Sequence, residues 1–303
     1  MSLLFDNFIE WKHYCENHNQ ALFEPVLAYE IEQKGRTQEQ IWDGMQKAYQ
    51  VMKDAVRTGL EEDMTSRSGM VNNSAKKVYK AKPILSPEFQ KLIARALAAK
   101  EVNSCMGRIV AAPTAGASGI LPGILTTIQE IHDLPDQTIL EGLLVAAGIA
   151  LIIEQNASLA GAVGGCQAET GSAAAMGSGA IVFCLGGSIE EVFAAVAITI
   201  QCMLGLVCDP VAGLVEVPCI VRNASGAAIA YSSAQIALAG VNPVIPVDEC
   251  IMALGEIGQS METRYKETAL GGLAATLTGQ AISKKVLIQD IEILPDEDPL
   301  SSR

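Results

Sequence analysis

The segment Leu206-Val-Cys-Asp-Pro-Val-Ala-Gly-Leu-Val-Glu-Val-Pro-Cys-Ile-Val-Arg-Asn223 holds two cysteines, Cys208 and Cys219, eleven positions apart. A continuous helix would separate them by about 16 Å along its axis, and an extended chain would separate them further. The two prolines and the glycine between them instead favour chain reversal, which would turn both sulfurs toward one point. Spacing alone leaves two interpretations open: a shared metal site, or two thiols packed in a core.

Three stretches, of which the last runs into the start of this segment, carry no charged residue: 142–153, 170–189 and 192–208. Two of them approach membrane-spanning length. Against a membrane location, Glu190-Glu191 leaves almost no loop between the last two, and no Lys or Arg occurs between Arg108 and Arg222 to set a topology. We therefore expect helices that are buried on all sides in a soluble core, with no membrane partner.

Composition predicts an all-α fold. Half of the 303 residues are hydrophobic but only 5% are aromatic. Because Gly, Ala and Ser fill the middle of the chain, a large, closely packed helical core with buried Gly/Ala-rich central helices fits better than a sheet. The net charge of −13 makes nucleic acid an unsuitable partner.

The chain has eight cysteines, and whether they form disulfides depends on the compartment in which the protein resides. Residues 1–12 lack the basic and then apolar pattern of a signal peptide, so we expect a cytoplasmic protein with unpaired thiols.

The chain divides into three predicted parts. Residues 1–82 form an amphipathic helical region to about Gly59 and then a loop with a basic end, and belong to the same domain as the core. Residues 83–283 form the helical core, whose first helix is expected over 86–102. Residues 284–303 form an acidic tail.

The stretch Ala112-Pro-Thr-Ala-Gly-Ala-Ser-Gly-Ile-Leu-Pro122 places small residues and hydroxyls before an apolar helical run. Free backbone N–H groups at such a helix start attract an anion. The candidate substrate-binding residues here are Thr114, Gly116, Ser118 and Gly119, and an ordinary helix cap is the alternative.

A third motif places Cys166 between Gly164-Gly165 and a small-residue helix, with Glu169 three residues on. A cysteine at a helix start is expected to have a lowered pKa and thiolate character, as metal ligation needs. Glu169 is costly in such an apolar neighbourhood unless it is paired or functional. It is therefore the candidate catalytic residue, and a buried carboxylate that caps backbone amides is the alternative.

These motifs resemble the α subunit of bacterial iron–sulfur L-serine dehydratase (L-serine ammonia-lyase) of the two-chain type. The resemblance covers roughly residues 60–280 and is most specific over the segment that carries Cys208 and Cys219. The matching stretches are Ala-Ala-Pro-Thr-Ala-Gly-Ala-Ser-Gly at 111–119, Gly-Gly-Cys-Gln-Ala-Glu-Thr-Gly at 164–171, Cys-Asp-Pro-Val-Ala-Gly-Leu-Val-Glu-Val-Pro-Cys at 208–219 and Arg-Tyr-Lys-Glu-Thr-Ala-Leu-Gly-Gly-Leu-Ala at 264–274.

The resemblance implies a lyase that converts L-serine to pyruvate and ammonia, with a [4Fe–4S] cluster as Lewis acid and a β subunit as partner. It implies Cys166, Cys208 and Cys219 as the cluster ligands, which favours the metal-site interpretation of the opening segment. Single-chain members end in a cysteine-bearing tail that can occupy the fourth iron, whereas Val286–Arg303 has no cysteine. The other five cysteines, Cys15, Cys105, Cys184, Cys202 and Cys250, are expected to be core thiols.

The general base and the cation for the substrate carboxylate are the least determined parts. Lys266, with Arg222 and Arg264, lies nearest to the motifs and is a candidate for carboxylate contact; surface salt-bridging is the alternative. None of the three histidines, His13, His18 and His132, lies in a motif, and the resemblance implies a histidine base on the other domain or subunit, so no base is assigned on this chain. Two other functions stay open: a related Fe–S lyase or hydratase acting on threonine, cysteine or a hydroxy acid, and a non-enzymatic helical protein.

Overall fold

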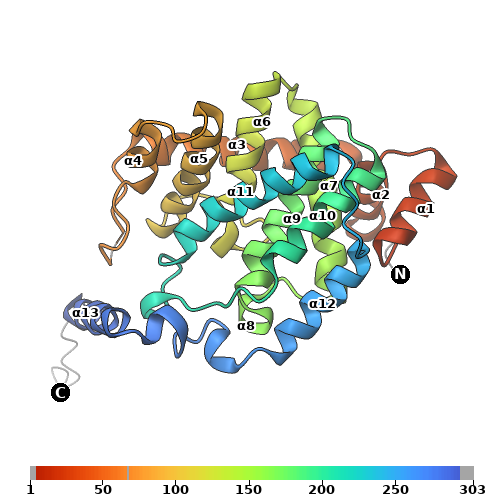
Figure 1. Cartoon of the computed structure of the whole chain (residues 1–303). Helices are drawn as coiled ribbons and strands as arrows, with labels where there is room; N and C mark the ends of the chain where they lie inside the picture. The colour runs from red at the N-terminus through yellow and green to blue at the C-terminus, as the bar shows by residue number, and fades with distance from the viewer. Residues whose placement is uncertain (1–4, 67, 294–303) are drawn as a thin grey trace, which may run out of the picture.

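The computed structural model describes residues 5–66 and 68–293, and its regular elements are α-helices with short 3-10 and π turns (Figure 1). In those ranges extended pairing is limited to two isolated bridges, so the predicted all-α fold is confirmed. The helices are α1 (Phe8–His18), α2 (Phe23–Lys34), α3 (Gln38–Glu61), α4 (Ser74–Lys80), α5 (Pro87–Ser104), α6 (Ile120–His132), α7 (Asp136–Asn156), α8 (Gly161–Gly164), α9 (Ser172–Cys184), α10 (Ile189–Met203), α11 (Cys219–Leu238), α12 (Val247–Ser260) and α13 (Leu277–Ile293).

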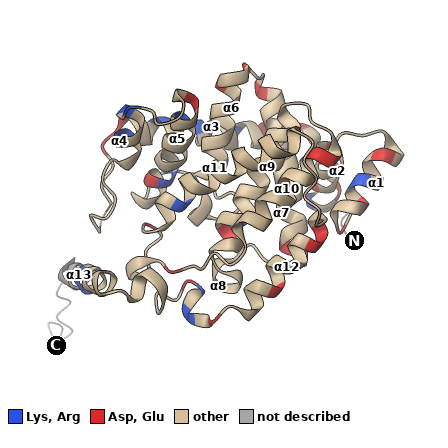
Figure 2. Ribbon diagram, in the orientation of Figure 1, with Lys and Arg blue, Asp and Glu red and all other residues tan. Residues whose placement is uncertain are grey.

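Helix α9 is the centre of the molecule, with α6, α7, α10 and α11 packed around it. Every residue from Ser172 to Val182 is buried, because a helix that is small and apolar on all faces is stable only when other helices surround it. Figure 2 shows charged residues mostly on the outer helices, and α9 without any. This confirms the prediction of buried Gly/Ala-rich central helices.

Small residues also set how closely neighbouring helices approach. At Gly123 in α6, an added Cβ would lie 2.7 Å from the backbone nitrogen of Ala96 in α5. Such contact between backbones requires glycine at the crossing. The N-terminal helices close the other side of the core: Trp11 is fully buried, and its indole N–H donates to the carbonyl of Leu22 at 3.1 Å.

The region between α3 and α5 differs from the expected loop, because residues 74–80 form α4. Its first turn is held from outside the segment: the carboxylate of Glu101, which is fully buried, accepts from the N–H groups of Ser74 at 2.6 Å and Ala75 at 3.0 Å. A carboxylate at a helix start satisfies free N–H donors and complements the helix dipole. The helix expected over 86–102 is confirmed, with bounds Pro87–Ser104.

One described helix, α7, is long and apolar enough to cross a membrane, but 61% of its most apolar window is buried inside the protein. At the other end of the chain, α13 continues through position 284, where the acidic tail was expected to begin. Residues 294–303 of that predicted tail lie outside the described residues.

Candidate active site

The three cysteines of the motifs come from three separate elements at one end of the central helices. Cys166 precedes a π turn, η2 (Gln167–Gly171), that leads into α9; Cys208 follows α10; and Cys219 is the first residue of α11. All three are buried, with 2%, 3% and 6% of their surface exposed. The chain between the last two reverses, with the N–H of Val211 donating to the carbonyl of Val217 at 2.8 Å. The reversal predicted from the prolines and glycine is therefore present.

The thiols lie close enough for each to affect the ionisation of the others. Burial raises the pKa of Cys208 well above the usual range, and the neighbouring charges of Cys166, Glu169 and Cys219 raise it further. Burial raises the pKa of Cys219 to about 12, with Cys166 adding to the shift. The pKa of Cys166 is also raised by burial, so the lowered value expected at a helix start is wrong. Desolvation outweighs the helix dipole there.

Most of the buried charges gather at this same end. Among residues 5–66 and 68–288, the buried charged side chains are Lys100, Asp209 and Glu216 at this end, and Glu101, which caps α4. Asp209 follows Cys208 directly in the sequence, and Glu216 lies three positions before Cys219. A buried charge is costly unless paired or used, so this concentration marks the region as functional.

Each buried carboxylate has specific partners. Asp209 forms an ion pair with Arg222 at 2.8 Å and accepts from the N–H of Leu273 at 2.7 Å. Glu216 accepts from the hydroxyls of Ser66 at 2.7 Å and Ser68 at 2.5 Å. These contacts draw residues that are distant in sequence against the segment between Cys208 and Cys219.

Glu169 lies between two glycines and beside a thiol. An added Cβ would come within 3.1 Å of its Oε1 at Gly116 and within 2.7 Å of its Oε2 at Gly161, and the Sγ of Cys208 is 4.0 Å from Oε2. Burial raises the pKa of Glu169, although the nearby Thr114 hydroxyl favours the ionised form. A partly buried carboxyl group with a raised pKa is suited to hold or transfer a proton.

The loop predicted to bind an anion, Thr114–Gly119, lies against this carboxyl group. It forms a short 3-10 turn, η1 (Ala115–Ala117), just before α6. The hydroxyl of Ser118 is buried and has no hydrogen-bond partner among the described residues, and the buried hydroxyl of Thr114 lies beside the Glu169 carboxyl group. Ser118 itself is 1% exposed. Buried hydroxyls normally have partners, so this turn has unused donors beside Glu169.

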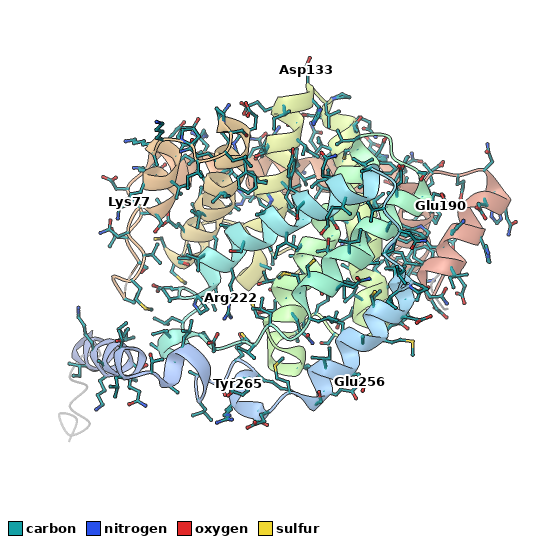
Figure 3. All side chains as sticks on the ribbon, in the orientation of Figure 1. Lys77, Asp133, Glu190, Arg222, Glu256 and Tyr265 are labelled. Atoms are coloured by element: carbon teal, nitrogen blue, oxygen red, sulfur yellow. The ribbon has the colours of Figure 1, made fainter. Side chains whose placement is uncertain are left out.

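A C-terminal segment covers Cys208 from the outside. The N–H of Cys208 donates to the carbonyl of Tyr265 at 2.8 Å, and its carbonyl accepts from the N–H of Glu267 at 2.9 Å. Figure 3 shows Arg222 at the start of α11 and Tyr265 on the segment below it. The backbone of Lys266 is thus paired with Cys208, while its ammonium group donates to the carbonyl of Gln259 at 3.4 Å.

The remaining cysteines do not share this environment. Cys15, Cys184 and Cys250 are buried and Cys105 is partly buried. Cys202 is exposed, so its assignment as a core thiol is wrong. The helical spacing of α10 turns it away from the core while Met203 is buried.

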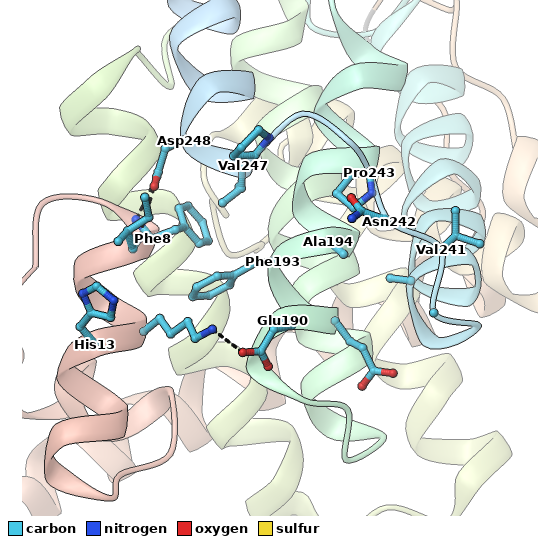
Figure 4. A pocket seen from close by; sticks show the side chains of 16 residues that line it. Phe8, His13, Glu190, Phe193, Ala194, Val241, Asn242, Pro243, Val247 and Asp248 are labelled. Carbon is cyan, nitrogen blue, oxygen red and sulfur yellow. Dashed lines mark hydrogen bonds and ion pairs between the residues drawn. The ribbon is translucent and has the colours of Figure 1, made fainter.

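A cavity of about 550 Å³ lies at the opposite end of α10 and α11. The start of α1, the starts of α10 and α12 and the loop after α11 line it. Phe8 and Phe193 meet edge to face in it, with ring centroids 4.7 Å apart, and His13 lies at its edge (Figure 4). Cys219 and Ala237 mark the two ends of α11, about 27 Å apart at about 1.5 Å per residue. The cavity therefore does not belong to the cysteine site.

The sequence analysis missed four side chains of this site: Lys100, Asp209, Glu216 and Asn223. Lys100 is fully buried, and burial lowers its pKa to about 8 against the opposing charges of Cys219 and Glu169. The sequence signal for Lys100 was its position next to Glu101 inside the mostly apolar run 92–102. A helix at the surface does not need such a pair within an apolar run.

Comparison with known proteins agrees with this geometry. The serine dehydratase alpha chain family matches residues 17–274. The chain is 43% identical to the L-serine dehydratase alpha chain of Peptoniphilus asaccharolyticus, covering 90% of this chain and 95% of that one. It is 42% identical to the probable L-serine dehydratase alpha chain of Bacillus subtilis, covering 93% and 95% respectively.

A longer relative matches only in part. The L-serine dehydratase of Streptomyces coelicolor is 36% identical over 83% of this chain but only 57% of its own length. It therefore has a further region beyond the match. The extent of the family match and the identity to full-length relatives show that this chain belongs to the serine dehydratase alpha chain family.

Proposed function

We propose that this chain is the α subunit of a lyase that converts L-serine to pyruvate and ammonia, with a [4Fe–4S] cluster held by Cys166, Cys208 and Cys219. The observation that carries the proposal is that three buried thiols from separate elements lie close to one another and to Glu169. The named relatives are L-serine dehydratases.

The donor set suits an iron–sulfur cluster. In residues 5–66 and 68–288, no three His, Cys, Asp or Glu side chains surround a position for one metal ion. Thiols alone, spread around a larger object, are the ligands that such clusters take. Their raised pKa values mean that loading the cluster would release protons, as thiolate ligation requires. When bound, a cluster with an iron free of protein ligand would supply Lewis-acid activation of the substrate hydroxyl.

The chain's own residues would bind and orient the substrate. The N–H groups of Ala115 and Gly116 and the hydroxyls of Thr114 and Ser118 are suited to the carboxylate of L-serine. Glu169, beside Gly116, is suited to the substrate ammonium group when ionised, or to hold a proton when neutral. Lys266 directs its ammonium group toward Gln259 in this conformation. It would reach a substrate only after rotation.

The elimination removes the α-proton and the hydroxyl group of serine. The resulting enamine tautomerises to an imine, and hydrolysis gives pyruvate and ammonia. Removal of the α-proton needs a base within about 3 Å. The described histidines lie elsewhere: His13 lines the distant cavity, His18 bonds the carbonyl of Tyr14, and His132 is exposed at the end of α6. We therefore assign the base to the partner subunit, which would also exclude water from the site.

Reconstitution tests the proposal. The purified chain is loaded anaerobically with iron and sulfide, and its visible spectrum is recorded. Pyruvate is then assayed from L-serine, L-threonine and L-cysteine, with and without the β subunit. A broad visible band and turnover that needs both chains are expected. Full turnover by this chain alone would overturn the assignment of the base, and faster turnover of threonine or cysteine would overturn the substrate. Preparations without iron absorption would overturn the cluster.

Exposure to air sharpens the same test. An open iron lacks the fourth thiolate, so activity is expected to decay in air and to return with ferrous iron and a thiol reductant. Undiminished turnover after prolonged aeration would contradict an open coordination position.

A further inference from the structure

We propose that Lys100 and Asn223 are positioning residues that hold the Ala115–Ala117 turn in the orientation that binds the substrate carboxylate. The choice of L-serine in the test rests on the function proposed above. Neither side chain is exposed: both have 0% of their surface accessible. They therefore act on the substrate through the turn.

Asn223 links the turn to the start of α11. Its side-chain N–H₂ donates to the carbonyls of Gly116 and Cys219, both at 2.8 Å, and its Oδ1 accepts from the N–H of Gly119 at 2.8 Å. Replacement of its amide nitrogen by oxygen would remove both donors. One side chain thus fixes the anion-binding turn relative to a candidate cluster ligand.

Lys100 holds the neighbouring carbonyl. Its ammonium group donates to the carbonyl of Ala115 at 3.2 Å and to Oδ1 of Asn103 at 2.5 Å. Its stem passes under the loop, since an added Cβ at Gly119 would lie 3.1 Å from the Cβ of Lys100. Burying an ammonium group costs free energy, and a neutral amide could donate to the Ala115 carbonyl equally well. The chain nevertheless has a lysine at this position.

The two contacts determine where the turn's N–H groups point. The C=O and N–H of one trans peptide point in opposite directions. With the Ala115 carbonyl held toward Lys100, the N–H of Gly116 points to the opposite side, and Gly116 is the residue that adjoins the Glu169 carboxyl group. Neither Ala115 nor Gly116 donates its N–H to any residue that the structure describes. The buried hydroxyl of Ser118, which has no partner among the described residues, and the hydroxyl of Thr114 beside Glu169 belong to the same loop.

The buried charge contributes as well as the geometry. Lys100 lies near the carboxyl groups of Glu169 and Glu216. A positive charge beneath the turn adds to the attraction for a substrate carboxylate and offsets the negative charge of these groups.

The test compares ligands that differ in the carboxylate. L-alanine has the carboxylate and ammonium groups of serine but no hydroxyl to eliminate, whereas ethanolamine has the hydroxyl and ammonium groups without the carboxylate. Titration calorimetry on the cluster-loaded two-subunit enzyme would measure both for Lys100→Met, Lys100→Arg and Asn223→Asp. Kinetics with L-serine would accompany the titrations.

We expect Lys100→Met and Asn223→Asp to weaken L-alanine and raise the KM for L-serine by about 10- to 100-fold, with a smaller change in kcat. Ethanolamine binding should stay unchanged, and Lys100→Arg should restore part of the loss. Glu101→Gln is the matched control, because Glu101 is adjacent and equally buried but caps α4. It should lower the unfolding temperature and leave L-alanine binding intact.

Two results would overturn the proposal: an unchanged KM with reduced kcat, or equal weakening of L-alanine and ethanolamine. If Lys100→Met does not fold, Lys100→Arg and Asn223→Asp test the proposal instead. The quantity compared is again the loss of affinity for L-alanine relative to the loss for ethanolamine. A wild-type enzyme that fails to turn over L-serine would instead refute the proposed function.

Discussion

The two ends of α10 and α11 are built on different principles. At one end, three thiols and the buried residues Lys100, Asp209 and Glu216 meet, three of them from helical positions and three from the segment between α10 and α11. At the other, aromatic and aliphatic side chains line a cavity, and the charged pair Lys12–Glu190 stays at the surface. The same helices therefore support a polar site whose burial costs desolvation free energy at one end and a mostly apolar cavity at the other.

The difference between the two ends shows where the fold can bury ionised side chains. Burying an ionised group costs several kcal/mol unless specific partners compensate it. At the cysteine end such partners are present: Ser66 and Ser68 for Glu216, and Arg222 for Asp209. At the cavity end, Asp248 only caps α1, accepting from the N–H of Phe8 at 2.9 Å. We expect changes at the first end to be costly and changes at the second to be mild.

The largest effect is expected from the cysteines. Replacing Cys166, Cys208 or Cys219 with Ser should remove iron and lower activity by about 10³-fold or more, because a Lewis acid contributes several kcal/mol to such a reaction. Iron content and pyruvate formation measure this. Cys184→Ser and Cys250→Ser should retain iron, because these thiols bond the backbone carbonyls of Thr138 and Ile245 instead. Iron loss in those variants but not in Cys166→Ser would reverse the assignment.

Next is the buried ion pair. Asp209→Ala should lower the free energy of unfolding by about 3–5 kcal/mol, because it leaves the partly buried guanidinium group of Arg222 without its carboxylate partner. It should also speed amide exchange at Glu267, whose segment is held by the Asp209–Leu273 bond. Urea unfolding and hydrogen exchange measure the two effects. Asp248→Ala, at the other end, should cost only about 1 kcal/mol as a lost helix cap; equal costs would remove the distinction between the ends.

A packing change between the two ends should have a smaller effect. Gly123→Ala places a methyl group 2.7 Å from the backbone nitrogen of Ala96, which cannot move aside without shifting α5. We expect a loss of about 1–3 kcal/mol in the free energy of unfolding. Gly44→Ala in α3 meets nothing within 4 Å and should gain up to about 1 kcal/mol from helix propensity. Stabilisation by both would mean that α5 and α6 are not closely packed.

The smallest effect is expected at the surface. Hydrogen bonds from Lys91 and then Arg95 lower the pKa of Glu130 below its ordinary value of 4.5. A lowered pKa in the folded state stabilises the protein above the unfolded-state pKa, and this contribution disappears as the pH falls through the folded-state value. Because the side chain is 47% exposed, Glu130→Gln should cost about 0–1 kcal/mol at neutral pH. Urea unfolding at pH 7 and pH 3 measures it, and a difference that persists at pH 3 would exclude the ion pair as its source.

Some features of the site were predictable because they depend on local sequence. The reversal between Cys208 and Cys219 follows from the prolines and glycine between them, and the loop at 114–119 from its small residues. Others depended on distant contacts. Glu101 is separated by 27 positions from the Ser74 amide that it caps, so nothing local to residues 74–80 announced a helix there.

The sequence by itself determined the helical class, the buried central helices and the segments that carry the three cysteines. Helix periodicity and small-residue composition act within a few turns and can be read along the chain. Only the tertiary structure decided that Lys100 and Asn223 bond the turn proposed to bind an anion, and that burial raises the pKa of Cys166. Desolvation and pairing of charges depend on every segment that surrounds a group, and those segments meet only after folding.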